Sequence, residues 1–173
     1  MNVIAHPRLA PTVQEQFRQA LQCLAGGVTV VTAGAGEDRT GLVVTSACSL
    51  SLDPARMLVC VNRRASAWPI IQQRRHLCFS VLAGHHQGVA ERFAGRGGVK
   101  GAARYEGSDW TTLGTGALGL RDALAVIDCD VEEILERHSH GIVIGAVRSV
   151  RLPASRGSEA LVYAEGRFAS LGL

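Results

Sequence analysis

Small, hydroxyl-bearing residues gather between positions 40 and 54 of this 173-residue chain. The apolar run 42–44 enters the segment, Asp53-Pro54 closes it, and the small residues between them are Thr45, Ser46, Ala47, Cys48, Ser49 and Ser51. Small side chains let a flat ligand approach the backbone, and hydroxyl groups donate hydrogen bonds to phosphate or carbonyl oxygens. A strand that runs into a serine-rich turn would have the same composition. Taken alone, the segment leaves a ligand groove and a simple turn both open.

Amide and basic side chains follow this segment. The apolar strand 57–62 ends at Asn62, Arg63 and Ser66 come directly after it, and Arg104 lies further along the chain. Guanidinium groups can hold a phosphate through two hydrogen bonds, although solvated surface charge is the commoner role of arginine. The strand-end amide could bind a ligand or close a turn.

Two histidines, His138 and His140, lie two residues apart between predicted strands. Residues at i and i+2 of a strand share a face and could bind a metal ion, but no third or fourth ligand lies close in the sequence. Two exposed turn histidines account for the same pattern. We therefore predict no metal site here.

Other catalytic patterns are not met. Residues 114–119 fit G-x-G-x-x-G, but dinucleotide binding needs a buried strand before the motif and a helix after it, and neither is predicted. The G-x-S-x-G nucleophile elbow does not occur, and no cysteine lies in an obviously electropositive, exposed context. We predict a flexible loop at 114–119 and no hydrolase chemistry.

The composition is that of a globular protein, with 47% hydrophobic and 19% charged residues. A net charge of +3 is too small to indicate nucleic-acid binding. The five cysteines are scattered and form no C-x-x-C pair, which favours reduced thiols in the cytoplasm over a zinc site. No apolar run approaches the roughly 18 residues of a membrane span, and the first residues lack the apolar region of a secretion signal.

The chain is predicted to form one domain, residues 12–173, behind a flexible N-terminal arm, residues 1–11. Thr12 and Glu15 have capping-box spacing and begin an amphipathic helix that ends at Gly26-Gly27. The predicted strands are 28–33, the run that ends at 44, 57–62, 77–82, 124–132, 141–150 and 161–168, with short helices at 67–73 and 86–93.

Two further features of the pattern bear on the topology. Glu132-Glu133 interrupts an alternating strand, which predicts a β-bulge. Most neighbouring strands are joined by short turns. An antiparallel closed sheet is therefore favoured over βαβ units.

Taken in order, these segments resemble the flavin reductase-like domain family. Its first signature, roughly Gly-x-Thr-(Val/Ala)-Ser-Ser-x-x-Ser-Val-Ser-x-x-Pro, is similar to residues 41–54, and its Asn/Asp-Arg-x-x-Ser is similar to residues 62–66. The family's (Lys/Arg)-Phe-x-Gly-x-x-Trp is similar to residues 104–110, and its Gly-Asp-His is similar to residues 138–140.

The resemblance implies a mainly β protein with short flanking helices: an FMN-binding split β-barrel of antiparallel, Greek-key topology, usually a homodimer with the flavin near the interface. The implied activity is that of an NAD(P)H:flavin oxidoreductase. Such an enzyme transfers hydride from NADH or NADPH to FMN or FAD and supplies reduced flavin to a partner oxygenase. The alternative is an FMN-binding protein without turnover, or a flavin-dependent reductase of a metal centre or corrinoid.

The resemblance also assigns residues. His140 would position the nicotinamide as the catalytic residue, and Ser66 and Arg104 would hold the flavin phosphate. The other implied flavin contacts are Val44, Thr45, Ser46, Ala47, Cys48, Ser51, Asn62, Arg63, Ser80 and Trp110. Three residues depart from the family pattern, because Val43 replaces Thr, Ser80 replaces Asn and Ser139 replaces Asp.

Overall fold

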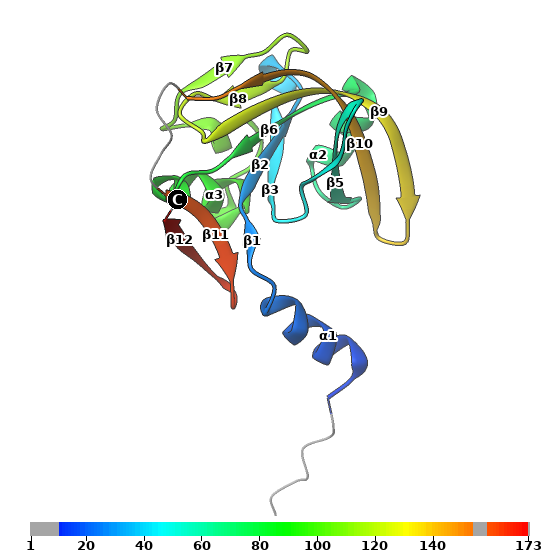
Figure 1. Ribbon diagram of the computed structural model, residues 1–173, viewed down its shortest axis with the longest axis vertical. Coiled ribbons are helices and arrows are strands. Elements are labelled where there is room, and N and C mark those ends of the chain that lie inside the picture. Colours follow the sequence, from blue (N-terminus) through cyan, green and yellow to red (C-terminus); the bar gives the residue numbers. More distant parts are fainter. Residues whose placement is uncertain (1–10, 154–158, 173) are drawn as a thin grey trace, which may run out of the picture.

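A curled antiparallel sheet of seven strands forms the body of the protein (Figure 1). The computed structural model describes residues 11–153 and 159–172. In spatial order the strands are β3 (Thr40–Val44), β2 (Thr29–Ala33), β6 (His76–Val81), β9 (Ala125–Arg137), β10 (His140–Arg151), β5 (Ala55–Asn62) and β4 (Cys48–Leu52). Every pair of neighbours is antiparallel, as the short connections predicted. The mainly β class is confirmed.

The two end strands of this sheet, β3 and β4, are consecutive in the sequence and are joined by residues 45–47 alone. The sheet therefore curls until its edges meet at this short link. Within the described residues β3 is paired only with β2, and β4 only with β5. The barrel is split between these edges, and unpaired backbone groups line the split.

Helix α2 (Ala67–Arg74) closes the interior of the barrel. Its buried residues Trp68 and Ile71 join a core supplied by six of the strands. The outer edge of the Trp68 ring lies against Gly141 at the start of β10, where a Cβ atom would stand 2.1 Å from the ring. Glycine is required at this position because the indole occupies the space of any larger side chain.

A second core lies outside the barrel, under α3 (Gln87–Phe93), the 3₁₀ turns η2 (Gly84–His86), η3 (Arg96–Gly98) and η4 (Gly101–Tyr105), and two small sheets. One sheet contains β1 (Gly26–Gly27), β11 (Glu159–Ala164) and β12 (Arg167–Gly172). The other contains β7 (Trp110–Thr112) and β8 (Leu118–Leu120). Phe93, Tyr105 and Trp110 pack together here with ring centroids 4.8–5.4 Å apart.

Several predicted elements are confirmed. The bulge predicted at Glu132-Glu133 is present, because Ile144 and Gly145 of β10 oppose Glu133 and Val131 and leave Glu132 unopposed. The capping box between Thr12 and Glu15 is also present, at the start of α1 (Val13–Gln22).

Two other elements predicted from the sequence need correction. The predicted strand 161–168 is two strands, because Glu165 and Gly166 both have positive φ and form a tight turn. The segment 114–119 is not a loose loop. It belongs to the β7–β8 hairpin and is fixed by Asp128, whose carboxylate accepts hydrogen bonds from Thr115 N at 3.0 Å and Thr115 Oγ1 at 2.5 Å. Another 3₁₀ turn, η1 (Gly36–Asp38), joins β2 to β3.

Helix α1 stands away from the barrel (Figure 1). It contributes no residue to the core, and one hydrogen bond, from Glu165 N to Gln22 O at 2.7 Å, fixes its C-terminal end to the β11–β12 turn. The predicted N-terminal arm, residues 1–11, lies outside the described residues apart from Pro11. Among the described helices, none combines the length and apolar character that crossing a bilayer requires.

Candidate functional site

The link between β3 and β4 carries the small residues of the first motif. Thr45, Ser46 and Cys48 are exposed and Ala47 is half-buried, whereas the side chain of Val44 points into the barrel core. Ser46 Oγ donates a hydrogen bond to the Cys60 carbonyl at 3.2 Å, which fixes the link against β5. Ser51 lies further along β4, where its hydroxyl donates to the Pro54 carbonyl.

A basic group lies at the opposite end of β3. Arg104 Nη1 donates to the Gly41 carbonyl at 2.5 Å and to Ser66 Oγ at 3.3 Å, and Arg104 Nε donates to the Val99 carbonyl at 3.4 Å. The Gly41 carbonyl therefore points to the free edge of β3. In an antiparallel pair alternate residues face the same edge, so the backbone groups of Val43 face it too. From Gly41 to Thr45 the free edge runs for about 13 Å.

The start of β10 forms a third part of the site. His140 pairs with Asn62 across β10 and β5, and its Nδ1 lies 2.9 Å from Ser139 Oγ. A cavity of about 650 Å³ adjoins this turn and is lined by Asn62, Arg63, Arg64, Trp68, His138 and Ser139. Asn62 Oδ1 accepts a hydrogen bond from Arg64 N at 2.9 Å, so this amide closes the turn after β5.

A second, more apolar cavity of about 250 Å³ lies beside the link. Val43, Val44 and Thr45 form one wall, and Tyr163 and Phe168 of the β11–β12 hairpin form another. The two aromatic rings are in edge contact at 5.1 Å. The site thus offers an arginine and a hydroxyl at one end, and at the other small exposed residues beside flat apolar walls. This donor set fits a phosphate joined to a planar ring system.

Comparison with known proteins agrees with this geometry. The model of the flavin reductase like domain family matches residues 21–172. The chain belongs to this family. The family, the split β-barrel fold and the enzyme class predicted from the sequence, an NAD(P)H:flavin oxidoreductase, are confirmed.

Three relatives show the extent of the similarity. FMN reductase (NADH) RutF 2 of Methylorubrum extorquens (strain PA1) is 40% identical over 148 residues, which are 86% of this chain and 84% of the relative. The NADH:FAD oxidoreductase SgcE6 of Streptomyces globisporus C-1027 has a TM-score of 0.82 at 26% identity, over 98% of this chain and 99% of that one. A homologue of nitrilotriacetate monooxygenase component B from Mycobacterium thermoresistibile has a TM-score of 0.83 at 27% identity, over 91% and 86% of the two chains.

Two residues expected at the flavin of this flavin reductase-like domain lie elsewhere. Ser80 is fully buried and its hydroxyl accepts a hydrogen bond from Leu120 N at 3.1 Å. Trp110 packs among the aromatic rings of the outer core and donates Nε1–H to the Tyr105 carbonyl at 3.0 Å. Both side chains stabilise the scaffold, and neither reaches the split.

Sequence reasoning missed three residues that shape the site. Tyr105 is buried, and its hydroxyl donates to the Thr40 carbonyl at 2.6 Å, which fixes the segment that carries Arg104. Burial raises the pKa of this hydroxyl well above its ordinary value, so the group stays protonated and can donate. Glu136, just before the turn into β10, accepts a hydrogen bond from Gln72 of α2. Their partners are distant in the chain, so no local signal marked them.

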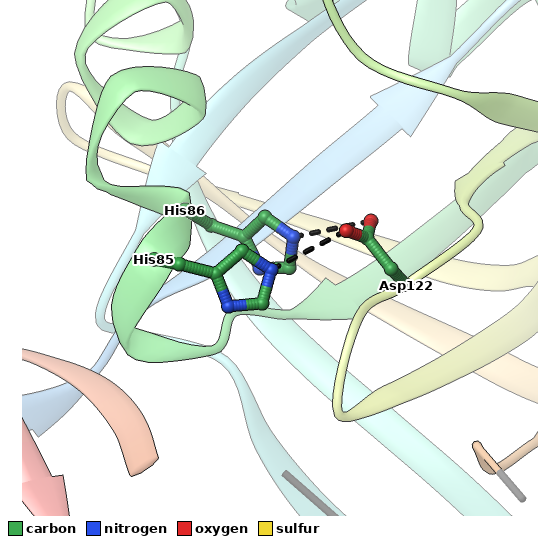
Figure 2. Close-up of side chains that lie close together, drawn as sticks. All are labelled: His85, His86 and Asp122. Carbon is green, nitrogen blue, oxygen red and sulfur yellow. Dashed lines mark hydrogen bonds and ion pairs between the residues drawn. The ribbon is translucent and has the colours of Figure 1, made fainter.

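One group of three possible metal ligands, His85, His86 and Asp122, occurs in the described residues (Figure 2). Asp122 is 3.1 Å from His86 Nε2 and 3.3 Å from His85 Nε2. His86 Nδ1 accepts a hydrogen bond from Ala83 N at 3.0 Å, so the neutral ring carries its proton on Nε2. That nitrogen then has no lone pair for a metal ion. We interpret the group as a hydrogen-bonded cap at the start of η2 and α3.

Proposed function

We propose that this protein transfers hydride from NADH to a flavin bound along the free edge of β3. It would then supply the reduced flavin to a separate oxygenase. The observation that carries the proposal is the meeting of Arg104 and Ser66, 38 residues apart in the chain, at the edge that also presents the small residues of the β3–β4 link.

The residues of the chain have separate tasks in this proposal. Arg104 is held by two carbonyls, from Gly41 and Val99, and is pre-positioned to hold a phosphate together with the Ser66 hydroxyl. Residues 45–48 leave room for a planar ring to lie against main-chain atoms. Backbone N–H groups at the split would stabilise negative charge on the ring.

When bound, the flavin supplies the ring nitrogen that accepts the hydride. The task of the chain is therefore to align the two rings rather than to provide a nucleophile. His140 directly follows Ser139, which lines the larger cavity, and its imidazole would orient the nicotinamide. NADH is the donor named for the RutF relative and for SgcE6, which supports NADH over NADPH.

A partner oxygenase is supported by the relative described as a component of nitrilotriacetate monooxygenase. We also propose a homodimer. Helix α1 is only 10 residues long, and a helix of this length is marginal in water by itself. Its apolar side chains Val13, Phe17 and Leu21 are exposed, as is Leu24 just after the helix. Docking of this face on a second copy of the chain would cover it.

A cytoplasmic location is supported by the cysteines. All five are free thiols, and Cys78 and Cys129 are buried in the two cores. Burial raises the pKa of both to about 12, so these thiols stay protonated and inert.

The activity is tested with purified protein, NADH, and FMN or FAD added in excess. We expect NADH oxidation that depends on the added flavin. Tight flavin binding without NADH oxidation would favour the non-turnover alternative. A protein that binds neither flavin would overturn the proposal.

A further inference from the structure

We propose that Arg63 is a positioning residue for His140 and not a ligand of the flavin phosphate. The inference rests on the proposed function, because it concerns the residue expected to orient the nicotinamide. It changes the role that the family resemblance implied for Arg63.

The contacts of Arg63 all lead to the turn between β9 and β10. Its backbone N–H donates to the Ser139 carbonyl at 3.0 Å, and Nη1 donates to the His138 carbonyl at 3.2 Å. Its Nη2 forms an ion pair with Glu136 at 2.9 Å. Arg63 thus joins the end of β5 to three of the four residues 136–139.

This turn needs external support. It joins β9 to β10 through only two residues, and His138 has a positive φ of 50°, which is uncommon for a residue other than glycine. The carbonyls of His138 and Ser139 both accept hydrogen bonds from Arg63. Removing the guanidinium would take away the hydrogen bond to the His138 carbonyl and the ion pair of Glu136.

His140 depends on the geometry of this turn. Its Nδ1 is paired with Ser139 Oγ at 2.9 Å, which leaves Nε2 free to face a ligand. Both side chains are exposed, so no packing fixes the ring. The backbone of the turn must therefore set the direction of the imidazole, and Arg63 fixes that backbone.

The support extends to α2. Gln72 Nε2 donates to Glu136 Oε1 at 3.2 Å, while Arg63 takes the other carboxylate oxygen. Glu136 therefore connects the turn to the helix that closes the barrel. It also neutralises the charge of Arg63.

Arg104 provides the contrast. Its N–H groups donate to two carbonyls and one hydroxyl. Among the described residues Arg104 forms no ion pair with a carboxylate. Its charge remains available for a phosphate. The charge of Arg63 is already compensated, so the two arginines have different tasks.

The test compares Arg63→Gln with Arg63→Lys, and uses Arg148→Gln as the matched control. Arg148 also pairs with a carboxylate across β9 and β10, with Nε 2.5 Å from Asp130, but at the other end of the strands. In Arg63→Gln we expect the KM for NADH to rise about 5- to 10-fold, with kcat and the flavin Kd within about 2-fold of wild type. Arg63→Lys should recover part of the loss, and Arg148→Gln should change neither constant. A flavin Kd that rises in Arg63→Gln while the KM for NADH stays constant would overturn the inference.

Glu136→Gln provides a second variant for a double-mutant cycle. Because Arg63 and Glu136 act through one contact, their effects on the KM for NADH should not add. Additive effects would contradict a shared role.

A readout without turnover separates this inference from the proposed function. We expect faster hydrogen exchange at the Arg63 amide, and greater mobility at Ser139 and His140 by NMR relaxation, in Arg63→Gln but not in Arg148→Gln. Unchanged hydrogen exchange and mobility of the turn in Arg63→Gln would contradict the positioning role, even if the enzyme reduces flavin. Faster exchange and greater mobility of the turn, in a protein that does not reduce flavin, would contradict the proposed function and leave the positioning role in place.

Discussion

Arg104 and Ser66 bring a cation and a hydroxyl to the same edge of β3. Arg104 is half-buried, and its three acceptors fix the guanidinium before any ligand arrives. Such pre-positioning lowers the entropy that binding must overcome. A phosphate here would gain charge-assisted hydrogen bonds, which are the stronger class.

The residue-scale prediction concerns this phosphate contact. Arg104→Ala should raise the Kd for FMN about 10- to 100-fold, because a charge-assisted hydrogen bond is worth about 1.5–3 kcal/mol. Fluorescence titration with FMN and with riboflavin measures it, and riboflavin, which lacks the phosphate, should lose little affinity. The control is Arg167→Ala, whose exposed guanidinium pairs only with Glu165. Equal losses for FMN and riboflavin would mean that Arg104 supports the fold and not the phosphate.

At the scale of elements, α3 begins at a titratable cap. Burial lowers the pKa of His86 below its ordinary value of 6.5; the charge of His85 adds to this effect, and the hydrogen bond to Asp122 and its charge counter it. Burial also opposes ionisation of Asp122, but its hydrogen bonds from His86 and His85 outweigh this and lower its pKa. Protonation of His86 would add a hydrogen to Nδ1, opposite the Ala83 N–H. The hydrogen bond from Ala83 N to His86 Nδ1, which caps the start of η2, would then be lost.

The pH prediction follows from the direction of the His86 shift. A folded-state pKa below the unfolded one means that the unfolded chain binds more protons at mildly acidic pH. The stabilisation is therefore present above pH 6.5 and is lost as the pH falls below that value toward the folded-state pKa. We expect His86→Asn to flatten this dependence between about pH 7.5 and about pH 5, measured from urea unfolding, since its amide oxygen can still accept from Ala83 N. His76, whose pKa burial also lowers, remains as a further contributor to the slope. The control His85→Asn removes an exposed ring, and a slope that persists in His86→Asn would contradict the prediction.

Helix α1 is the other element that carries a prediction. Phe17 is 63% exposed at the centre of its apolar face. If this face docks on a second copy, Phe17→Ser should shift the protein from dimer toward monomer in light scattering at micromolar concentration, because a large apolar anchor is lost. Gln19→Ala changes a polar position of the same helix and should leave the mass unchanged. A wild-type monomer would refute the dimer.

At the scale of the whole molecule, the barrel depends on one close contact between α2 and β10. Gly141→Ala would bring a methyl group within 2.1 Å of the Trp68 ring. The helix would have to move out of the barrel, at a cost of about 1–3 kcal/mol in the free energy of unfolding. Gly27→Ala is the matched control because nothing lies within 4 Å of a Cβ atom there. Urea unfolding compares the two, and equal midpoints would show that Trp68 can move freely.

Much of this protein could be predicted from its sequence. Alternation and short turns predicted an antiparallel sheet, Glu132 predicted the bulge, and Thr12 with Glu15 predicted the cap of α1. These features depend on neighbours along the chain, and local pattern records them. The family motifs also named Ser66 and Arg104, which the fold brings within 3.3 Å.

Other features were decided only by the tertiary structure. Ser80 and Trp110 occupy motif positions, but the hydrogen bonds of their side chains to the backbone of Leu120 and Tyr105 were shown only by the tertiary structure. The clamp of Arg63 and Glu136 spans 73 residues of sequence, and the split between β3 and β4 exists because the sheet curls. Side-chain type and spacing follow from the sequence alone, whereas which distant groups meet, and which partner neutralises a charge, follows from how the strands close around one core.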